Sequence, residues 1–180
     1  MIKADWENKS LVWIVGVCYA ANLVLGWAGY FLCQPSSVAQ MLLYQLGNAC
    51  AISGSVMAAR YVGLQGQQVA ASAYILLGIT HGISLAALGR SSVNVERGMT
   101  MVMPMIPALV FMFWCELYPK WLRIAGVIPI LLFVLIYLNV QLEKPYFGWE
   151  VNAGYATLQI VEVLWGVYLI KDWQRRRLRA

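Results

Sequence analysis

The sequence predicts an all-α membrane protein, a bundle of six transmembrane helices joined by short loops. Of its 180 residues, 61% are hydrophobic and only 12% are charged, whereas soluble domains carry about 25% charged residues. The apolar residues form runs long enough for the roughly 20 residues that a bilayer-crossing helix needs. Proline, glycine and polar clusters separate these runs and leave no room for a soluble domain in the loops. We therefore expect a single domain over residues 1–180.

The expected helices begin and end where these separators fall. The segment CQPSS follows the first helix, YPKW separates the fourth from the fifth, and EKPYFGWEVN separates the fifth from the sixth. Acidic residues precede the first apolar run and no small-residue cleavage site follows it, so we expect this helix to be retained. The helices are expected at about residues 10–32, 38–62, 68–89, 99–118, 121–142 and 152–171, with a basic cytoplasmic tail at 172–180.

Polar and small residues recur at steps of three and four along the first, second and sixth expected helices. Such spacing places them on one face of each helix. Lipid offers no hydrogen bonds, so these faces should contact other helices or a water-filled cavity. The three faces contain Tyr19, Asn22, Gly26, Gly29 and Cys33; then Gln45, Asn48 and Ser55; then Asn152, Tyr155, Gln159, Glu162 and Gly166.

The third, fourth and fifth expected helices lack such a polar face and show other sequence features. Gly78 and Gly82 form a G-x-x-x-G pattern in the third helix, which predicts close approach of another backbone. The fourth helix contains two prolines, Pro104 and Pro107, which are expected to bend it. The fifth has no polar stripe before Asn139 and is expected to be the most lipid-exposed.

The distribution of Lys and Arg predicts the orientation. With both termini inside, ten of these residues fall on the inner side and three on the outer side, which favours cytoplasmic termini. We expect the protein in a bacterial-type inner membrane, with lipid as its surroundings and anionic lipid at the basic C-terminal tail. Nucleic acid is not expected as a partner, because no folded basic domain follows the tail.

One histidine lies within the third apolar run, and three other polar residues share its depth. His81, Glu162, Asn22 and Asn48 lie on four different helices, and the helical rise of about 1.5 Å per residue places all four near the bilayer midplane. An ionisable group at that depth suggests a functional site, because it costs a few kcal/mol to bury there. We expect these four residues to bind a substrate or ion, with His81 and Glu162 in contact and sharing a proton.

Three functions remain open at this point. The first is a small channel or transporter for a small solute or ion, with proton linkage as one option. The second is a non-catalytic subunit or assembly factor of a larger membrane complex, in which the His81–Glu162 contact only fixes helix register. The third is an intramembrane enzyme for a lipid-soluble substrate. The sequence favours a non-enzyme, because it contains no hydrolase, metalloprotease or haem-attachment motif.

Cofactors and assembly are less constrained by the sequence. The four cysteines have no C-x-x-C spacing, so no metal site is expected. The identity of any cofactor stays open. A homo-oligomer or a larger membrane complex is compatible with the short loops.

Reporter fusions test the predicted topology. A fusion after Ala180 and a fusion within the loop at residues 143–151 should report opposite sides of the membrane, because one more helix lies between them. The Ala180 fusion should report the cytoplasm. Two fusions that report the same side would contradict the six-helix topology.

Overall fold

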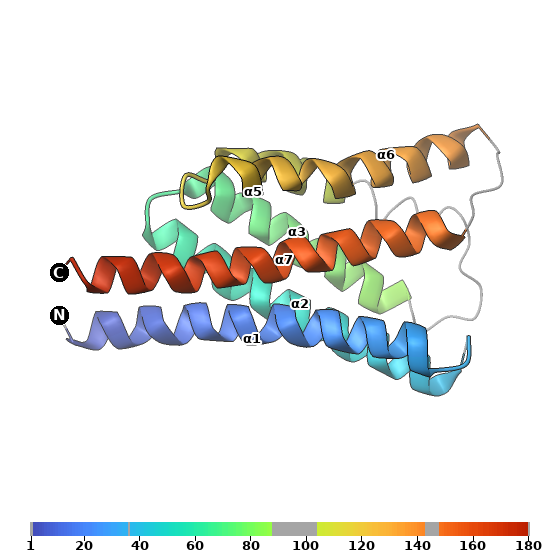
Figure 1. Cartoon of the computed structure of the whole chain (residues 1–180), viewed down its shortest axis with the longest axis horizontal. Coiled ribbons are helices and arrows are strands. Elements are labelled where there is room, and N and C mark those ends of the chain that lie inside the picture. The colour runs from blue at the N-terminus through green and yellow to red at the C-terminus, as the bar shows by residue number, and fades with distance from the viewer. Residues whose placement is uncertain (1, 36, 88–103, 143–147, 180) are drawn as a thin grey trace.

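The structure, a computed structural model, describes residues 2–35, 37–87, 104–142 and 148–179. Within these ranges the chain is almost entirely helical and forms no strand. Residues 104–111 are helical and lead directly into η1. Figure 1 shows one bundle in which α1 begins and α7 ends at the same end. The elements are α1 (Ile2–Leu32), α2 (Val38–Leu64), α3 (Gln68–Ala87), η1 (Met112–Trp114), α5 (Lys120–Ala125), α6 (Val127–Gln141) and α7 (Gly148–Arg177).

Four helices are long and apolar enough to cross a membrane. They are Asn8–Leu32, Gln68–Ala86, Lys120–Asn139 and Val151–Arg177. A fifth apolar helix, Pro104–Trp114, is shorter. α2 has sufficient length, 27 residues, but its Gln, Asn and Ser side chains make it less apolar. The all-α class is confirmed for the described ranges, and residues 99–103 of the expected fourth helix lie outside them.

Two expected helix ends are corrected by the structure. α7 continues through Arg177, so most of the expected tail at 172–180 extends the helix instead of following it. The expected helix 99–118 ends at Trp114, because Cys115 takes an extended conformation with φ −75° and ψ 102°. The next helix then begins after Pro119, whose missing N–H suits the start of a helix.

The expected helix 121–142 is divided at Gly126. α5 ends before this residue and α6 begins after it, although the two remain nearly collinear because Gly126 keeps φ −62° and ψ −15°. Pro129 explains the division. It has no N–H to donate to the carbonyl of Ala125, so one helical hydrogen bond is lost there.

The turn between α2 and α3 requires a positive φ of 82° at Gly66. Glycine adopts this backbone conformation without steric cost.

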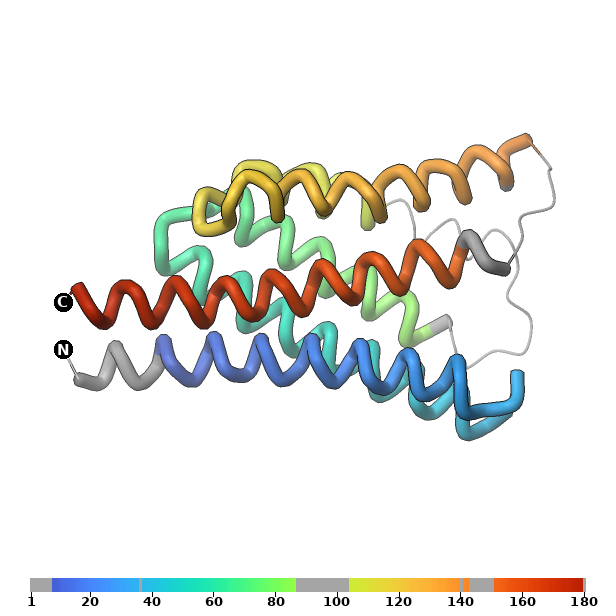
Figure 2. The backbone as a smooth tube through the Cα atoms, in the orientation of Figure 1, coloured from blue at the N-terminus to red at the C-terminus, as the bar shows by residue number. Residues whose placement is uncertain are grey.

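α1 and α7 pack closely along the bundle. They run side by side, as Figure 2 shows, and α1 also packs against α2. A Cβ atom added to Gly166 of α7 would lie only 3.1 Å from the Cα of Gly16 in α1. The two backbones therefore approach to a distance that leaves no room for a side chain on Gly166. Small residues at the contact between two helices permit such an approach.

The G-x-x-x-G pattern in α3 does not mark the tightest helix contact. A Cβ atom on Gly78 would meet the Cβ of Ser55 in α2 at 3.4 Å, an ordinary contact. Among the described residues, a Cβ atom on Gly82 would meet nothing within 4 Å. Within that part of the chain the prediction of a tight contact at Gly82 is therefore wrong. Closer contacts lie between α1 and α7, and between α1 and α2, where a Cβ atom on Gly54 would be 3.2 Å from the Cβ of Cys18.

An aromatic cluster fills the bundle between α3, α7 and the segment after η1. Trp165 stacks on Tyr118 with ring centroids 6.2 Å apart. Trp165 also meets Tyr74 edge-on at 5.9 Å, and the hydroxyl groups of Tyr74 and Tyr118 are hydrogen-bonded to each other. All three side chains are at most 2% exposed. They join helices that are far apart in sequence.

Leucine substitutions at Gly166 and at Gly82 should distinguish a tight helix contact from an open position. Gly166→Leu should lower thermal stability in detergent by about 1–3 kcal/mol or more, because the new side chain meets the α1 backbone. Gly82→Leu is the matched control and should melt near the wild type, because no described atom lies within 4 Å of a Cβ atom at this position. Equal destabilisation by both variants would contradict the close α1–α7 approach.

Candidate functional site: a buried polar network

The four polar residues singled out in the sequence lie together inside the bundle. Asn22 belongs to α1, Asn48 to α2, His81 to α3 and Glu162 to α7. The side chains of Glu162, His81 and Asn22 are 0%, 2% and 4% exposed, and Asn48 is half-buried. Each of these groups must therefore obtain its hydrogen bonds from the protein.

One continuous chain of hydrogen bonds joins the four side chains. His81 Nε2 lies 2.7 Å from Glu162 Oε1, and Asn22 Nδ2 donates to Glu162 Oε2 at 3.0 Å. On the other side of the imidazole, His81 Nδ1 lies 3.0 Å from Asn48 Oδ1. The predicted contact of His81 with Glu162 is confirmed, and the network links α1, α2, α3 and α7.

The direction of these bonds places one shared proton on the His81–Glu162 contact. Asn48 Nδ2 donates to the carbonyl of Tyr44 at 2.9 Å, which turns Asn48 Oδ1 toward the imidazole. An amide oxygen only accepts, so His81 Nδ1 must carry a hydrogen. A second hydrogen must then lie between His81 Nε2 and Glu162 Oε1, since two lone pairs would repel at 2.7 Å. Whichever atom holds that proton, the pair has no net charge.

Gln159 fixes the other end of the network. It lies one turn before Glu162 on α7, and its Nε2 is 3.3 Å from the carbonyl of Asn22 and 3.4 Å from Asn22 Oδ1. This contact turns the Nδ2 of Asn22 toward the carboxylate. Amide and imidazole donors therefore converge on Glu162 from α1 and α3. Gln159 shared the polar stripe of α7 in the sequence but was not among the four predicted site residues.

Other buried polar groups near the network were not predicted as site residues. The hydroxyls of Tyr19 and Ser55 are hydrogen-bonded at 3.1 Å, and both residues are 0% exposed. Their place on the polar stripes of α1 and α2 could have suggested them. Trp165, one turn beyond Glu162, buries its Nε1 with no hydrogen-bond partner within the described ranges. An isolated tryptophan in an apolar run gives no such signal, because it is typical of a packed core.

Side chains, not close backbone packing, connect α3 with α7. α3 packs on α2 and contacts η1, while α7 packs on α1 and α6. Within the described residues, α3 and α7 are not a close-packed pair of helices. They are joined by the His81–Glu162 contact at 2.7 Å and by the edge-on Tyr74–Trp165 contact. A movement of α3 relative to α7 would therefore break these side-chain contacts first.

The groups in this network suit proton transfer and hydrogen bonding. In the part of the chain that the structure describes, no cluster of three or more His, Cys, Asp or Glu side chains could hold a metal ion. The polar groups of the network around Glu162 are three side-chain amides, those of Asn22, Asn48 and Gln159, and the imidazole of His81. They can bind a proton, a small cation or a hydrogen-bonding solute.

Two substitutions of Glu162 should differ sharply in stability. Glu162→Gln keeps the shape, because a glutamine can donate to His81 Nε2 and accept from Asn22, so it should melt near the wild type. Glu162→Leu leaves both partners without their hydrogen bonds and should lower stability by about 1–3 kcal/mol or more. Thermal melting of the purified protein in detergent measures both. A leucine variant as stable as the glutamine variant would show that the bonds do not contribute to folding.

Comparisons with known proteins do not add an assignment to this geometry. No family model, no curated protein and no solved structure matches the chain. The function is therefore argued from the chemistry of the network that contains His81 and Glu162.

Proposed function

We propose that the protein is a proton-linked membrane transporter for a small cation or cationic solute, with Asn22, Asn48, His81 and Glu162 as its binding site. The proposal includes six membrane crossings, cytoplasmic termini and a bacterial-type inner membrane. Four helices of sufficient length and apolarity support the membrane location. The observation that carries the proposal is the 2.7 Å contact between His81 Nε2 and Glu162 Oε1, in a site where both side chains are at most 2% exposed.

Charge neutrality couples the proton to the solute. Removing the shared proton would leave one negative charge on buried groups, which is strongly unfavourable away from water. A cation that enters the site can take the place of the proton and restore neutrality. The solute is then bound as the proton leaves, and the proton returns as the solute leaves. Two amide groups, Asn22 and Asn48, are placed to orient such a solute by hydrogen bonds.

Energetic magnitudes favour this role over a purely structural one. Polar contacts between membrane helices contribute about 0.6 kcal/mol on average, while a charged residue at the bilayer centre costs about 2.5–3.5 kcal/mol. A well-packed apolar pair would join α3 and α7 at least as stably as His81 and Glu162. The ionisable pair therefore contributes little to the stability of the bundle, whereas its chemistry is suited to proton exchange.

The surroundings of the pair offer a place where the bundle can open. α3 and α7 meet through side chains, so a displacement of α3 relative to α7 would expose Glu162 without separating a close-packed α3–α7 pair, provided that α2, on which α3 packs, moves with it. Trp165 Nε1 is a buried donor with no acceptor among the described residues, and a solute oxygen or a water molecule would satisfy it. The indole lies on the side of Glu162 toward the end where α7 finishes.

Proton exchange in liposomes tests the proposal. The purified protein is reconstituted with a pH-sensitive dye inside, a proton gradient is imposed, and Na⁺, K⁺ and methylammonium are added in turn. The wild type should move protons in response to at least one of these cations. Glu162→Gln should move none, because it preserves the hydrogen bonds but has no exchangeable proton.

Thr157→Val is the matched control on the same helix. Within the described residues, the Thr157 hydroxyl donates to carbonyls of α7 itself, those of Ala153 and Gly154 at 2.7 and 2.9 Å. This variant should exchange protons at the wild-type rate. Equal exchange by Glu162→Gln and the wild type would overturn the proposal, as would a wild type that responds to none of the three cations.

A further inference from the structure

The polar network is enclosed on the side that faces the chain termini. Its neighbours on this side come from α1, α2, α3, α7 and the segment after η1. All of them are at most 2% exposed: Tyr19, Ser55, Tyr74, Tyr118 and Trp165. Most of these side chains are aromatic, and they close the bundle between the network and the end where α1 begins and α7 ends (Figure 1).

The other side of the network is lined by polar residues of α2 that are only half-buried. Asn48, the partner of His81, is preceded on this helix by Gln40, Tyr44 and Gln45, and all four are half-buried. Steps of three and four residues place them on one face of α2. This face leads from the imidazole to the end of the bundle opposite the termini (Figure 1).

Hydrogen bonds join this face of α2 to α1 and to the imidazole. Gln40 Nε2 donates to the carbonyl of Gly29 in α1 at 3.1 Å and to the hydroxyl of Tyr44 at 3.3 Å. Asn48 Nδ2 donates to the carbonyl of Tyr44 at 2.9 Å. The Tyr44 ring packs on Gly29, where an added Cβ atom would lie 2.8 Å from Tyr44 Cε1. Polar groups therefore follow one another from Gln40 to His81.

Two groups on this face require a partner that the described residues do not supply. The Tyr44 hydroxyl accepts from Gln40, but its own hydrogen has no acceptor in the described part of the chain. The half-buried amide of Gln45 forms no hydrogen bond within the same ranges. Lipid cannot satisfy a hydroxyl or an amide, whereas water can. α2 has 27 residues but is not among the four helices that are apolar enough to cross a membrane, which fits a helix with one face in water.

We propose that this face of α2 lines a water-filled entrance, through which a small cation or cationic solute reaches His81 and Glu162 from the side opposite the termini. The inference deepens the proposed function and rests on it for the nature of the solute. The oxygens of Gln40, Tyr44 and Gln45 are uncharged ligands that suit the passage of a cation. In this conformation the site is open toward the entrance and closed toward the termini.

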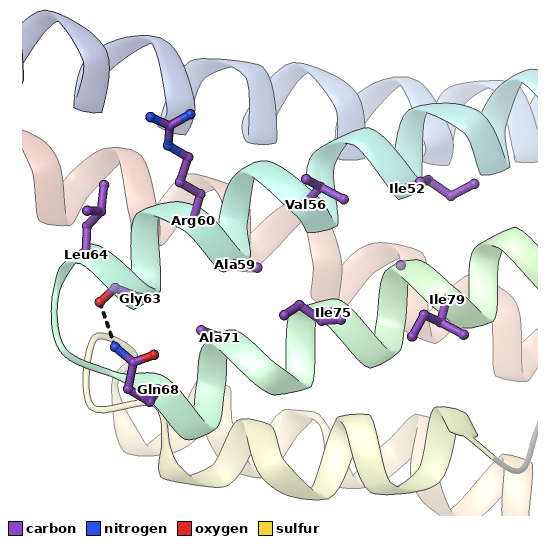
Figure 3. Close-up of a pocket in the computed structure, with 11 residues that line it drawn as sticks. Ile52, Val56, Ala59, Arg60, Gly63, Leu64, Gln68, Ala71, Ile75 and Ile79 are labelled. Atoms are coloured by element: carbon purple, nitrogen blue, oxygen red, sulfur yellow. Dashed lines mark hydrogen bonds between the residues drawn. The ribbon is translucent and has the colours of Figure 1, made fainter.

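The groove between α2 and α3 on the outside of the bundle is a different feature. Figure 3 shows branched apolar side chains along it, among them Val56 and Ile75, while the side chain of Arg60 points away from it. None of the four residues of the polar network lines this groove. Lipid would cover Val56 and Ile75, which are 51% and 53% exposed. Exposure alone therefore does not identify the entrance, and Val56 offers a control for it.

Thiol labelling of substituted cysteines tests the entrance. Membrane vesicles that contain Tyr44→Cys or Gln45→Cys are treated with a charged, membrane-impermeant methanethiosulfonate. Peptide mass spectrometry then separates the new cysteine from the four native ones. Both variants should react from the side opposite the termini, at least about tenfold faster than Leu46→Cys, because the reagent attacks the ionised thiol. Leu46 is 56% exposed at the same depth but faces away from the entrance, where lipid does not support ionisation.

Three controls complete the experiment. Leu178→Cys, at the exposed end of α7, should react only from the side of the termini and reports the orientation of the vesicles. Val56→Cys should react as slowly as Leu46→Cys, because lipid covers the groove. Ser55→Cys, a nearly isosteric change on the enclosed side of the network, should react from neither side.

The outcome separates the entrance from the proposed function. Labelling of Tyr44→Cys and Gln45→Cys that is no faster than that of Leu46→Cys would overturn the entrance, and so would labelling from the side of the termini. The reaction does not require proton exchange. Fast labelling from the expected side in a protein that exchanges no protons would support the entrance and overturn the proposed function alone.

Discussion

The hydrogen bond between His81 and Glu162 is the interaction on which the arrangement of the bundle depends. The two residues come from α3 and α7, and their remaining hydrogen bonds extend to α2 through Asn48 and to α1 through Asn22. All of these bonds are directional, and they are satisfied together only when four helices have the right rotation and depth. A buried network of this kind specifies one arrangement more strongly than apolar packing does, because each unsatisfied member is costly.

The bundle is rigid on one side of this network and deformable on the other. α1 and α7 approach so closely at Gly16 and Gly166 that a side chain on Gly166 has no room. α3 and α7, in contrast, are connected through His81–Glu162 and the aromatic contact of Tyr74 with Trp165. Side-chain contacts can be exchanged by rotamer changes, whereas a close backbone contact cannot. The α3–α7 contact can therefore be exchanged more readily than the α1–α7 contact, although α3 itself remains packed on α2.

The site was more accessible to sequence analysis than the helix packing. Glu162 and His81 stand out because ionisable residues are rare in long apolar runs, and the helical rise is enough to compare their depths. Gly82 was misjudged because a G-x-x-x-G pattern records residue size but not which helix lies opposite. The Gly16–Gly166 contact could not be found for the same reason, since it joins opposite ends of the chain. The break before α6 could have been predicted from the sequence, because Pro129 has no N–H and removes one helical hydrogen bond.

The contact between α1 and α7 has a consequence for the order in which the protein is made. Ribosomes deliver α1 first, and Asn22 then lacks its partner until the carboxylate of Glu162 has been synthesised. His81 on α3 also lacks its hydrogen-bond partner until Glu162 has been synthesised. During most of its synthesis the chain therefore contains polar groups in apolar helices without their final hydrogen bonds. The polar groups of α1 and α3 therefore reach their final hydrogen bonds only after α7 has been synthesised.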